Sequence, residues 1–190
     1  MNMTSFLSRI PATAAVAALV LAAAPSVSLA QLATGSNAPV DITADEGEVV
    51  NSQCLSIWRG DAEALQATTR LRAHEIRVFA AARPGSAPNA QGRCGATQRL
   101  EAEGEVYYVT PAQTVRGDRA IYVAANDTIT ITGGVIVTQG KSVARGDRMT
   151  VQVKTGQVQL ESTAKGRGKP NRVRGVFYPD QAPSAPAAKP

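Results

Sequence analysis

Apolar and polar side chains alternate along most of the chain from about residue 39 onwards. Branched apolar residues recur in pairs two positions apart, as at Ile129 and Ile131 and at Val151 and Val153. A period of two places both members of a pair on one face of a β-strand. No long stretch beyond residue 30 sustains the 3.6-residue spacing of an amphipathic helix. The pattern predicts an all-β protein.

Two similar segments lie 29 residues apart, Arg116-Gly117-Asp118-Arg119 and Arg145-Gly146-Asp147-Arg148. A related segment, 58–64, precedes the first by about twice that interval, and short apolar runs and turn residues follow each later copy. Units that repeat at a constant interval stack into an elongated sheet whose members contact mainly their neighbours. We therefore expect several short strands per unit and one continuous apolar face. We interpret the Arg-Gly-Asp triplets as bends beside strands, in preference to adhesion motifs.

The first thirty residues have the pattern of a secretory signal peptide. Arg9 is the only charged residue before Asp41, and 12–24 is almost entirely Ala, Val and Leu. Small residues at 28 and 30 predict cleavage after Ala30. The apolar run is shorter than the roughly 18 residues that a membrane-spanning helix needs. We expect export to the periplasm.

The remaining sequence is long enough for one domain with its own core. We expect an N-terminal linker at 31–38, a β domain at 39–178, and a Pro/Ala-rich disordered tail at 179–190. Within the domain, 81–95 is rich in Gly, Pro and Ala, which predicts a flexible loop.

The chain has 20 Lys and Arg against 15 Asp and Glu, and loss of Arg9 with the leader leaves a net charge of +4. Several of the cations lie between Lys165 and Arg174. Such a cluster attracts anionic lipid or an acidic glycan, or it is a solvated tail that aids solubility. Few aromatic residues are available for base stacking, so we expect no nucleic-acid partner.

Cys54 and Cys94 are the only cysteines. In an oxidising compartment we expect them to form a structural disulfide that closes a loop of about 40 residues. A metal site would need more ligands than these cysteines and His74, the only histidine. A catalytic thiol would need a histidine partner, and nothing in the sequence ties His74 to either cysteine.

Glu101, Glu103 and Glu105 have the spacing that would put three carboxylates on one strand face, as a glycosidase needs. The simpler interpretation is the solvent face of a strand. The sequence has no phosphate-binding loop, nucleophile elbow or metal-ligand spacing. We expect a protein that is not an enzyme and needs no cofactor or metal.

The sequence resembles the LptA/OstA-like family of periplasmic lipopolysaccharide-transport proteins over essentially the whole predicted domain. The resemblance lies in the segments 39–45, 58–66, 104–111 and 172–179 and in the two Arg-Gly-Asp-Arg repeats. It implies an open, many-stranded antiparallel β-jelly roll with a V-shaped section. It further implies head-to-tail homo-oligomers and docking to inner- and outer-membrane transport components of similar fold. The 81–95 loop, the cysteine pair and the tail depart from the family pattern.

The same resemblance implies that lipid A acyl chains of lipopolysaccharide lie in an apolar groove while the sugars face water. For each expected inward residue, ordinary core packing is the alternative. We expect the groove to be lined by Ile42, Ile57, Leu65, Leu71, Ile76, Val106, Ile121, Val123, Ile129, Ile131, Val135, Val137, Val151, Val153, Val158 and Leu160.

Two other functions remain open at this point. The first is an envelope scaffold that polymerises through its β-edges without carrying lipid. The second is a glycan-cleaving enzyme on a repeat β scaffold. Lipid uptake would distinguish the carrier from the scaffold, and hydrolysis that depends on Glu101 or Glu103 would identify the enzyme.

Overall fold

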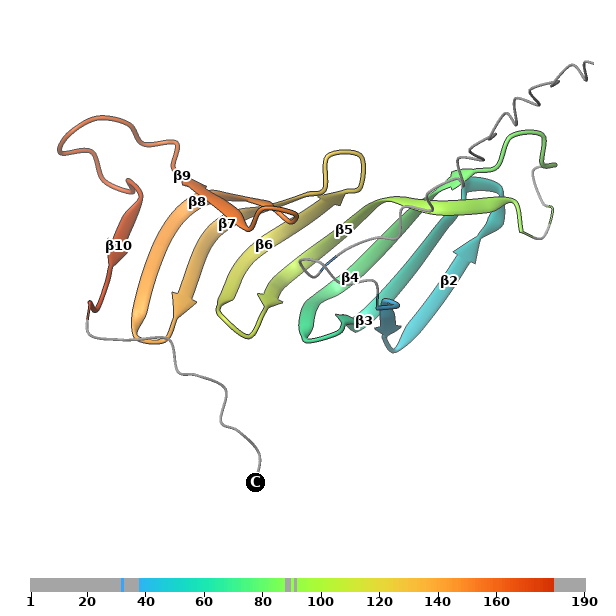
Figure 1. Cartoon of the computed structure of the whole chain (residues 1–190), viewed down its shortest axis with the longest axis horizontal. Coiled ribbons are helices and arrows are strands. Elements are labelled where there is room, and N and C mark those ends of the chain that lie inside the picture. The colour runs from blue at the N-terminus through green and yellow to red at the C-terminus, as the bar shows by residue number, and fades with distance from the viewer. Residues whose placement is uncertain (1–31, 33–37, 88–89, 91, 180–190) are drawn as a thin grey trace, which may run out of the picture.

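The computed structural model describes residues 32, 38–87, 90 and 92–179, which form one bent antiparallel sheet (Figure 1). Its strands are β1 (Asp41–Thr43), β2 (Glu46–Val50), β3 (Leu55–Gln66), β4 (Thr69–Ala82), β5 (Cys94–Val109), β6 (Thr114–Val123), β7 (Thr128–Gln139), β8 (Ser142–Gln152), β9 (Gln157–Glu161) and β10 (Arg174–Val176). One 3-10 turn, η1 (Asn51–Gln53), separates β2 from β3. The predicted signal peptide and residues 180–190 of the predicted tail lie outside the described residues.

From β3 to β8 the strands pair in chain order, so that neighbours in sequence are neighbours in the sheet. Each edge is shared by two short strands: β1 and β2 both pair with β3, and β9 and β10 both pair with β8. The sheet is therefore open, with one edge at each end of the row in Figure 1. In the described part of the chain, no helix is long and apolar enough to span a bilayer.

Each long strand bends near its middle, and the bends lie at matching positions across the sheet. On β3, β5 and β7 the bend consists of two residues with positive φ, the first of which is Gly60 (79°), Gly104 (82°) or Gly133 (88°). The strand register shifts at each of these points. A two-residue bulge of this kind needs glycine, because a Cβ is strained at positive φ. The aligned bulges divide the sheet into two halves.

Strands β6 and β8 have a glycine at the same line for a different reason. A Cβ on Gly117 of β6 would lie 2.5 Å from Ile131 Cγ2, and one on Gly146 of β8 would lie 2.7 Å from the carbonyl oxygen of Glu161. These two glycines have no positive φ, so they are required by close approach of the neighbouring strand. The Gly of each Arg-Gly-Asp-Arg repeat is thus a packing residue at the bend.

The prediction of an all-β, open antiparallel sheet is confirmed. The strands are longer than the short ones expected, because the glycine pairs bend a strand without ending it. Gly133 and Gly134, for example, lie inside the 12-residue strand β7. The expected loop at 81–95 is shorter in the structure, since β4 continues to Ala82 and β5 begins at Cys94.

Candidate functional site

The apolar side chains of one sheet face form rows that cross the strands. Residues directly paired across an antiparallel ladder point to the same face, so the register identifies each row. On one side of the line of bends there are two rows. The first is Trp58, Ile76, Ala102, Ala120, Ile131, Met149 and Leu160. The second is Ser56, Val78, Leu100, Tyr122, Ile129, Val151 and Val158. On the other side of the bends, the matching row is Ile42, Ala64, Leu71, Tyr108, Val115, Val137 and Ala144.

The two halves of the sheet bury these rows against each other in a single apolar cluster. In the middle strands the side chains are almost inaccessible: Ile76, Val106 and Ile131 are fully buried. Toward the β9 edge the same face becomes accessible, and Val158 is 44% exposed. The interior is therefore closed along its centre and opens at the β9 edge of the sheet.

Leu32 lies inside this cluster although it precedes the first strand by several residues. Its side chain is 1% exposed. Its backbone N–H donates to Gln66 Oε1 (2.5 Å), and its carbonyl accepts from the Tyr108 hydroxyl (2.9 Å). Gln66 also donates to the carbonyl of Ala38 (2.8 Å). Leu32 thus contributes an apolar side chain to the interior at β3 and β5.

Burial of Tyr108 has a measurable electrostatic consequence. Loss of solvation raises the pKa of the Tyr108 phenol to about 12, because the phenolate is poorly stabilised in the apolar interior. The hydroxyl therefore stays protonated at physiological pH and remains a donor to the Leu32 carbonyl.

Twelve of the sixteen residues expected to line the groove belong to this interior. They either lie in the rows above or are buried in the same cluster: Ile42, Leu71, Ile76, Val106, Ile129, Ile131, Val135, Val137, Val151, Val153, Val158 and Leu160. They come from every part of the sheet between β1 and β9, so the interior runs across the sheet without interruption.

The expectation was wrong in orientation for Ile57, Leu65, Ile121 and Val123. Ile121 pairs directly with Glu101 and Thr130, which places it on the opposite, polar face. Each of the other three likewise pairs with an arginine of that face: Ile57 with Arg77, Leu65 with Arg70 and Val123 with Arg99. The interior positions beside Ile121 are filled by Ala120 and Tyr122.

The physical reason is that these stretches are apolar at consecutive positions, so alternation alone does not choose the inward residue. In the run from Ala120 to Val123, Tyr122 takes the interior position and donates from its hydroxyl to Asp127 Oδ1 (3.1 Å). Beside Leu65, the small side chain of Ala64 points inward and is fully buried. The register with the neighbouring strands therefore fixes the orientation that alternation leaves open.

Sequence reasoning missed many interior residues, most of them small or aromatic. Cross-strand register, which no short sequence window contains, is what places them inside. They are Leu32, Trp58, Ala62, Ala64, Ala73, Val78, Leu100, Ala102, Tyr108, Val115, Ala120, Tyr122 and Met149. The alanines next to the bend residues of β3 and β4, Ala62 and Ala73, were the sequence signal that could have identified part of this set.

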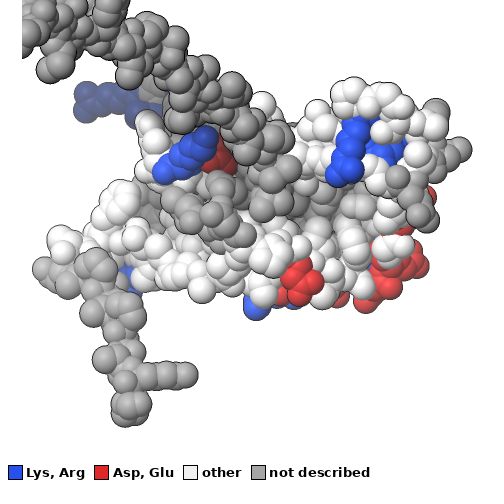
Figure 2. Space-filling view, turned by 45° about the vertical axis from the view of Figure 1, so that its right-hand side comes forward, with Lys and Arg blue, Asp and Glu red and all other residues white. Residues whose placement is uncertain are grey.

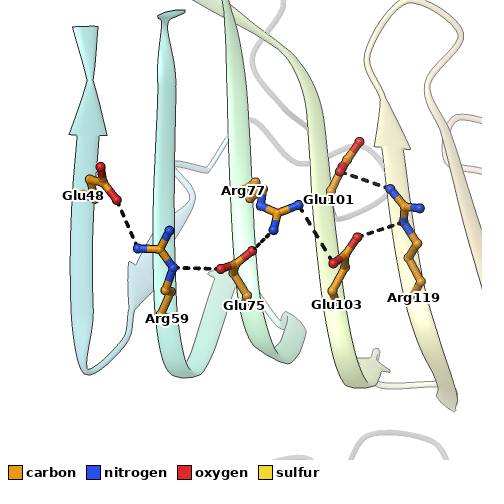
Figure 3. A network of polar contacts seen from close by, with 7 residues as sticks. All are labelled: Glu48, Arg59, Glu75, Arg77, Glu101, Glu103 and Arg119. Carbon is orange, nitrogen blue, oxygen red and sulfur yellow. Dashed lines mark hydrogen bonds and ion pairs between the residues drawn. The ribbon is translucent and has the colours of Figure 1, made fainter.

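On the opposite face of the sheet, an unbroken network of ion pairs runs from β2 to β6 (Figure 3). The contacts are Glu48–Arg59 (3.1 Å), Arg59–Glu75 (2.8 Å), Glu75–Arg77, Arg77–Glu103 (3.9 Å), Glu103–Arg119 (3.4 Å) and Arg119–Glu101 (3.2 Å). Hydrogen bonds to Glu48 and Glu75 raise the pKa of Arg59 above its ordinary value. This face is polar and internally neutralised.

Two of the three candidate catalytic carboxylates belong to that network. Glu101 has an 8% exposed side chain and contacts both Arg99 and Arg119 at 3.2 Å, and Glu103 contacts Arg77 and Arg119. Glu105 lies beyond them, in the positive-φ bulge, near His74 and Arg116. Glu103 and Glu105 are partly exposed, as expected for the solvent face of a strand, whereas Glu101 is buried between its two arginines.

Asp147 of the second Arg-Gly-Asp-Arg repeat connects β8 to the chain after β9. Its Oδ2 accepts from the Thr163 backbone N–H (2.8 Å), the Thr163 hydroxyl (2.8 Å) and the Ser162 hydroxyl (3.0 Å). These bonds lower the pKa of Asp147, since they favour its ionised form. The aspartate of this repeat therefore anchors the segment that leads toward β10.

The expected Cys54–Cys94 disulfide is confirmed, and its Cα atoms lie 5.3 Å apart. It joins the residue after η1 to the first residue of β5, and the bonded residues are 40 apart in sequence. On the chain-entropy model, closing a loop of this size contributes roughly 3 to 4 kcal/mol. The disulfide fixes one end of β5 beside β3 and β4.

Among residues 32, 38–87, 90 and 92–179, no group of three or more His, Cys, Asp and Glu side chains is arranged to hold a metal ion. Figure 2 shows a surface in which uncharged residues predominate and charged side chains gather in separate patches. The feature that distinguishes this fold is thus the apolar interior between the two halves of the sheet.

An open antiparallel sheet bent around an apolar interior defines a β-jelly roll of the open type. The sequence from 41 to 157 matches the model of the LptA/(LptD N-terminal domain) LPS transport protein family. That match covers more than half of the chain, which therefore belongs to this family.

Two of the known proteins that are similar to the chain illustrate the relationship. One is the uncharacterized protein R00383 from Rhizobium meliloti (strain 1021), which is 31% identical over 148 residues, covering 77% of this chain and 78% of the relative. The other is the crystal structure of LptH from Pseudomonas aeruginosa, described as the LptA homologous periplasmic component of a lipopolysaccharide transport device. It has a TM-score of 0.59 and 15% identity, and the match covers 75% of this chain and 96% of LptH. At that identity, the second likeness establishes the fold.

Proposed function

We propose that this protein binds lipopolysaccharide in the periplasm and shields its lipid A acyl chains between the two halves of the sheet. The observation that carries the proposal is the apolar interior that runs from Ile42 at one edge to Leu160 at the other. Membership in a lipopolysaccharide-transport family supports the same cargo. The protein acts as a carrier and not as an enzyme.

The energetic need for shielding is large. Each methylene removed from water is worth about 0.8 kcal/mol, so a multi-chain lipid cannot cross an aqueous gap unprotected. An interior of similar apolar residues along its length offers binding sites of nearly equal strength. Such a path holds the acyl chains without trapping them at one point. The directional drive must come from other components.

Loading requires the two halves to separate, because Ile76, Ile131 and Met149 at the centre are fully buried. Acyl chains would replace the contacts that these side chains make with one another. Leu32 occupies part of the same space, so cargo also competes with the N-terminal segment. Since apolar contacts are exchanged for apolar contacts, the opening costs less than exposing the interior to water.

The partners follow from the open edges. The edge formed by β1 and β2, and the edge formed by β9 and β10, each present unpaired backbone groups that a further strand can satisfy. We expect head-to-tail homo-oligomers and contacts with membrane-bound transport components of similar fold. The signal-peptide pattern at 1–30 and the periplasmic location of LptH support the same compartment.

The same edges support a second candidate function, an envelope scaffold that polymerises without carrying lipid. A binding assay with fluorescent lipopolysaccharide separates the two functions. Val158 faces the interior at the accessible end, whereas the next residue, Gln159, is exposed on the opposite face. We expect Val158→Asp to weaken binding at least several-fold and Gln159→Asp to leave it unchanged. Equal binding by both variants, with self-association intact, would favour the scaffold.

A further inference from the structure

The polar face changes character where it crosses to β8 and β10. On β3, β4 and β6, Arg59, Arg77 and Arg119 each contact a carboxylate (Figure 3). On the last strands of the sheet, Arg145 of β8 pairs directly with Arg174 of β10. Within the described residues, neither of these guanidinium groups lies within 4.0 Å of a carboxylate oxygen. The Arg145–Arg174 pair therefore differs from Arg59, Arg77 and Arg119, which contact carboxylates.

A direct cross-strand pair of like charges is unfavourable for the sheet. The strand pairing holds the backbones of Arg145 and Arg174 side by side, and both side chains are exposed. An anion placed between them would remove the repulsion. The planar guanidinium group suits phosphate oxygens in particular, because it donates two parallel hydrogen bonds.

The two arginines line a shallow pocket of about 370 Å³. The other lining residues are Lys141, Val143, Val176 and Tyr178. Its wall thus combines three cationic side chains with apolar ones. The backbone N–H of Tyr178 donates to the Ser142 hydroxyl (3.2 Å), which holds the chain after β10 against the start of β8. The pocket has the mixed character that an amphiphile with an anionic group requires.

Exposed apolar side chains gather next to this pocket. Val176 is 46% and Tyr178 52% exposed, and both line the pocket, whereas the ring of Phe177 lies on the other face of β10, over Gly175. Aromatic residues beside arginine are typical of surfaces that contact the interfacial region of a bilayer. The exposed apolar side chains and the pair of like charges thus lie in the same pocket.

We propose that the pocket formed by β8 and β10 docks the protein on an anionic bilayer by binding phospholipid phosphate groups. Charge complementarity selects the anionic headgroup, and Val176 and Tyr178 enter the interfacial region beside it. The site lies on the polar face, separate from the apolar interior. It therefore adds a membrane-surface contact to the carrier function and does not depend on it.

The test is co-sedimentation of the protein, purified after export from expressing cells, with vesicles of two compositions. One is pure phosphatidylcholine, and the other is phosphatidylcholine mixed with phosphatidylglycerol. We expect binding to the mixed vesicles only, weakened by added salt. Arg145→Gln/Arg174→Gln should reduce that binding roughly tenfold or more, since each basic residue near an anionic surface contributes to attraction.

The control is Arg83→Gln/Lys154→Gln, which removes the same charge from two exposed positions outside the pocket. It should bind within about twofold of the unmodified protein, as expected for charges outside the contact. Equal loss in both double variants would overturn the proposal in favour of net charge alone. Binding to neutral vesicles, or a change in self-association with vesicle binding intact, would also overturn it, the latter by making the surface a protein interface. Thermal unfolding checks the fold, and loss of like-charge repulsion should not lower the midpoint.

Discussion

The carboxylate of Asp118 on β6 lies against Gly133 on β7, so closely that a Cβ on that glycine would be 2.2 Å from Asp118 Oδ2. The same glycine has a φ of 88°. Gly133→Ala therefore introduces both backbone strain and a collision at the line of bends. We expect a loss of about 2 to 4 kcal/mol in the free energy of unfolding, measured by urea denaturation.

The adjacent Gly134 provides the matched control. It also has a positive φ, of 52°, but a Cβ there would meet no atom within 4 Å. Gly134→Ala should cost only the backbone strain, about 1 kcal/mol. If the two variants were equally stable, contact with Asp118 would have no part in the bend.

The all-β class and the open sheet could be predicted from the alternation of apolar residues, the repeats and the family resemblance. These signals are present either in a few consecutive residues or in the chain as a whole. The lengths of the strands do not follow, since Gly133-Gly134 has the same local signature whether a strand ends or bends there. Only the neighbouring strand decides between these outcomes. Asp118 lies 15 positions from Gly133 in sequence but next to it in the sheet.

Glu101 is the most buried member of the ion-pair network, held between Arg99 and Arg119. Glu101→Gln keeps the shape of the side chain and removes the charge that both guanidinium groups contact. We expect it to lower the free energy of unfolding by about 1 to 3 kcal/mol. Glu48→Gln, at the exposed end of the network, should cost less than about 1 kcal/mol. Equal losses would indicate that burial does not strengthen these pairs.

Tyr108 makes stability depend on pH in the alkaline range. Its pKa is about 12 in the folded protein, against an ordinary value of 10.0, so the folded state retains the proton longer than the unfolded state. The stabilisation is complete below pH 10 and is lost as pH rises through 12. We expect unfolding midpoints to fall in this window, and to fall less in Tyr108→Phe.

Tyr108→Phe also removes the hydrogen bond to the Leu32 carbonyl, which should cost about 1 kcal/mol at neutral pH. Tyr178→Phe is the control, because Tyr178 is exposed. Identical alkaline profiles for the two variants would contradict the buried position of Tyr108.

Asp147 gives the opposite dependence at low pH. Its pKa is lowered by bonds from Thr163 and Ser162, so its stabilising effect is present above its ordinary value of 3.8. The effect is lost as pH falls below that value and through the lowered pKa. Asp147→Asn should flatten the acid limb of the stability curve. Circular dichroism during acid titration measures this difference. An unchanged acid limb would show that the ionisation of Asp147 does not contribute to stability.

Most of the twelve interior residues could be predicted because their neighbours in sequence are polar, as Ile131 between Thr130 and Thr132 illustrates. Ile121 could not, since both of its neighbours are apolar and the inward position falls to Tyr122. The burial of Leu32 was equally beyond reach, because it depends on Gln66 and Tyr108, which are distant in sequence.

The most direct test of the carrier function is photo-crosslinking in living cells from single positions on the two faces. A photoreactive amino acid at Val151 or Val158 faces the interior, whereas the same group at Gln152 or Gln159 faces away from it. Lipopolysaccharide adducts at Val151 and Val158, with few or none at the two glutamines, are the predicted result. Adducts of equal yield on both faces, or none at the interior positions of a folded protein, would contradict the proposal that acyl chains travel between the halves of the sheet.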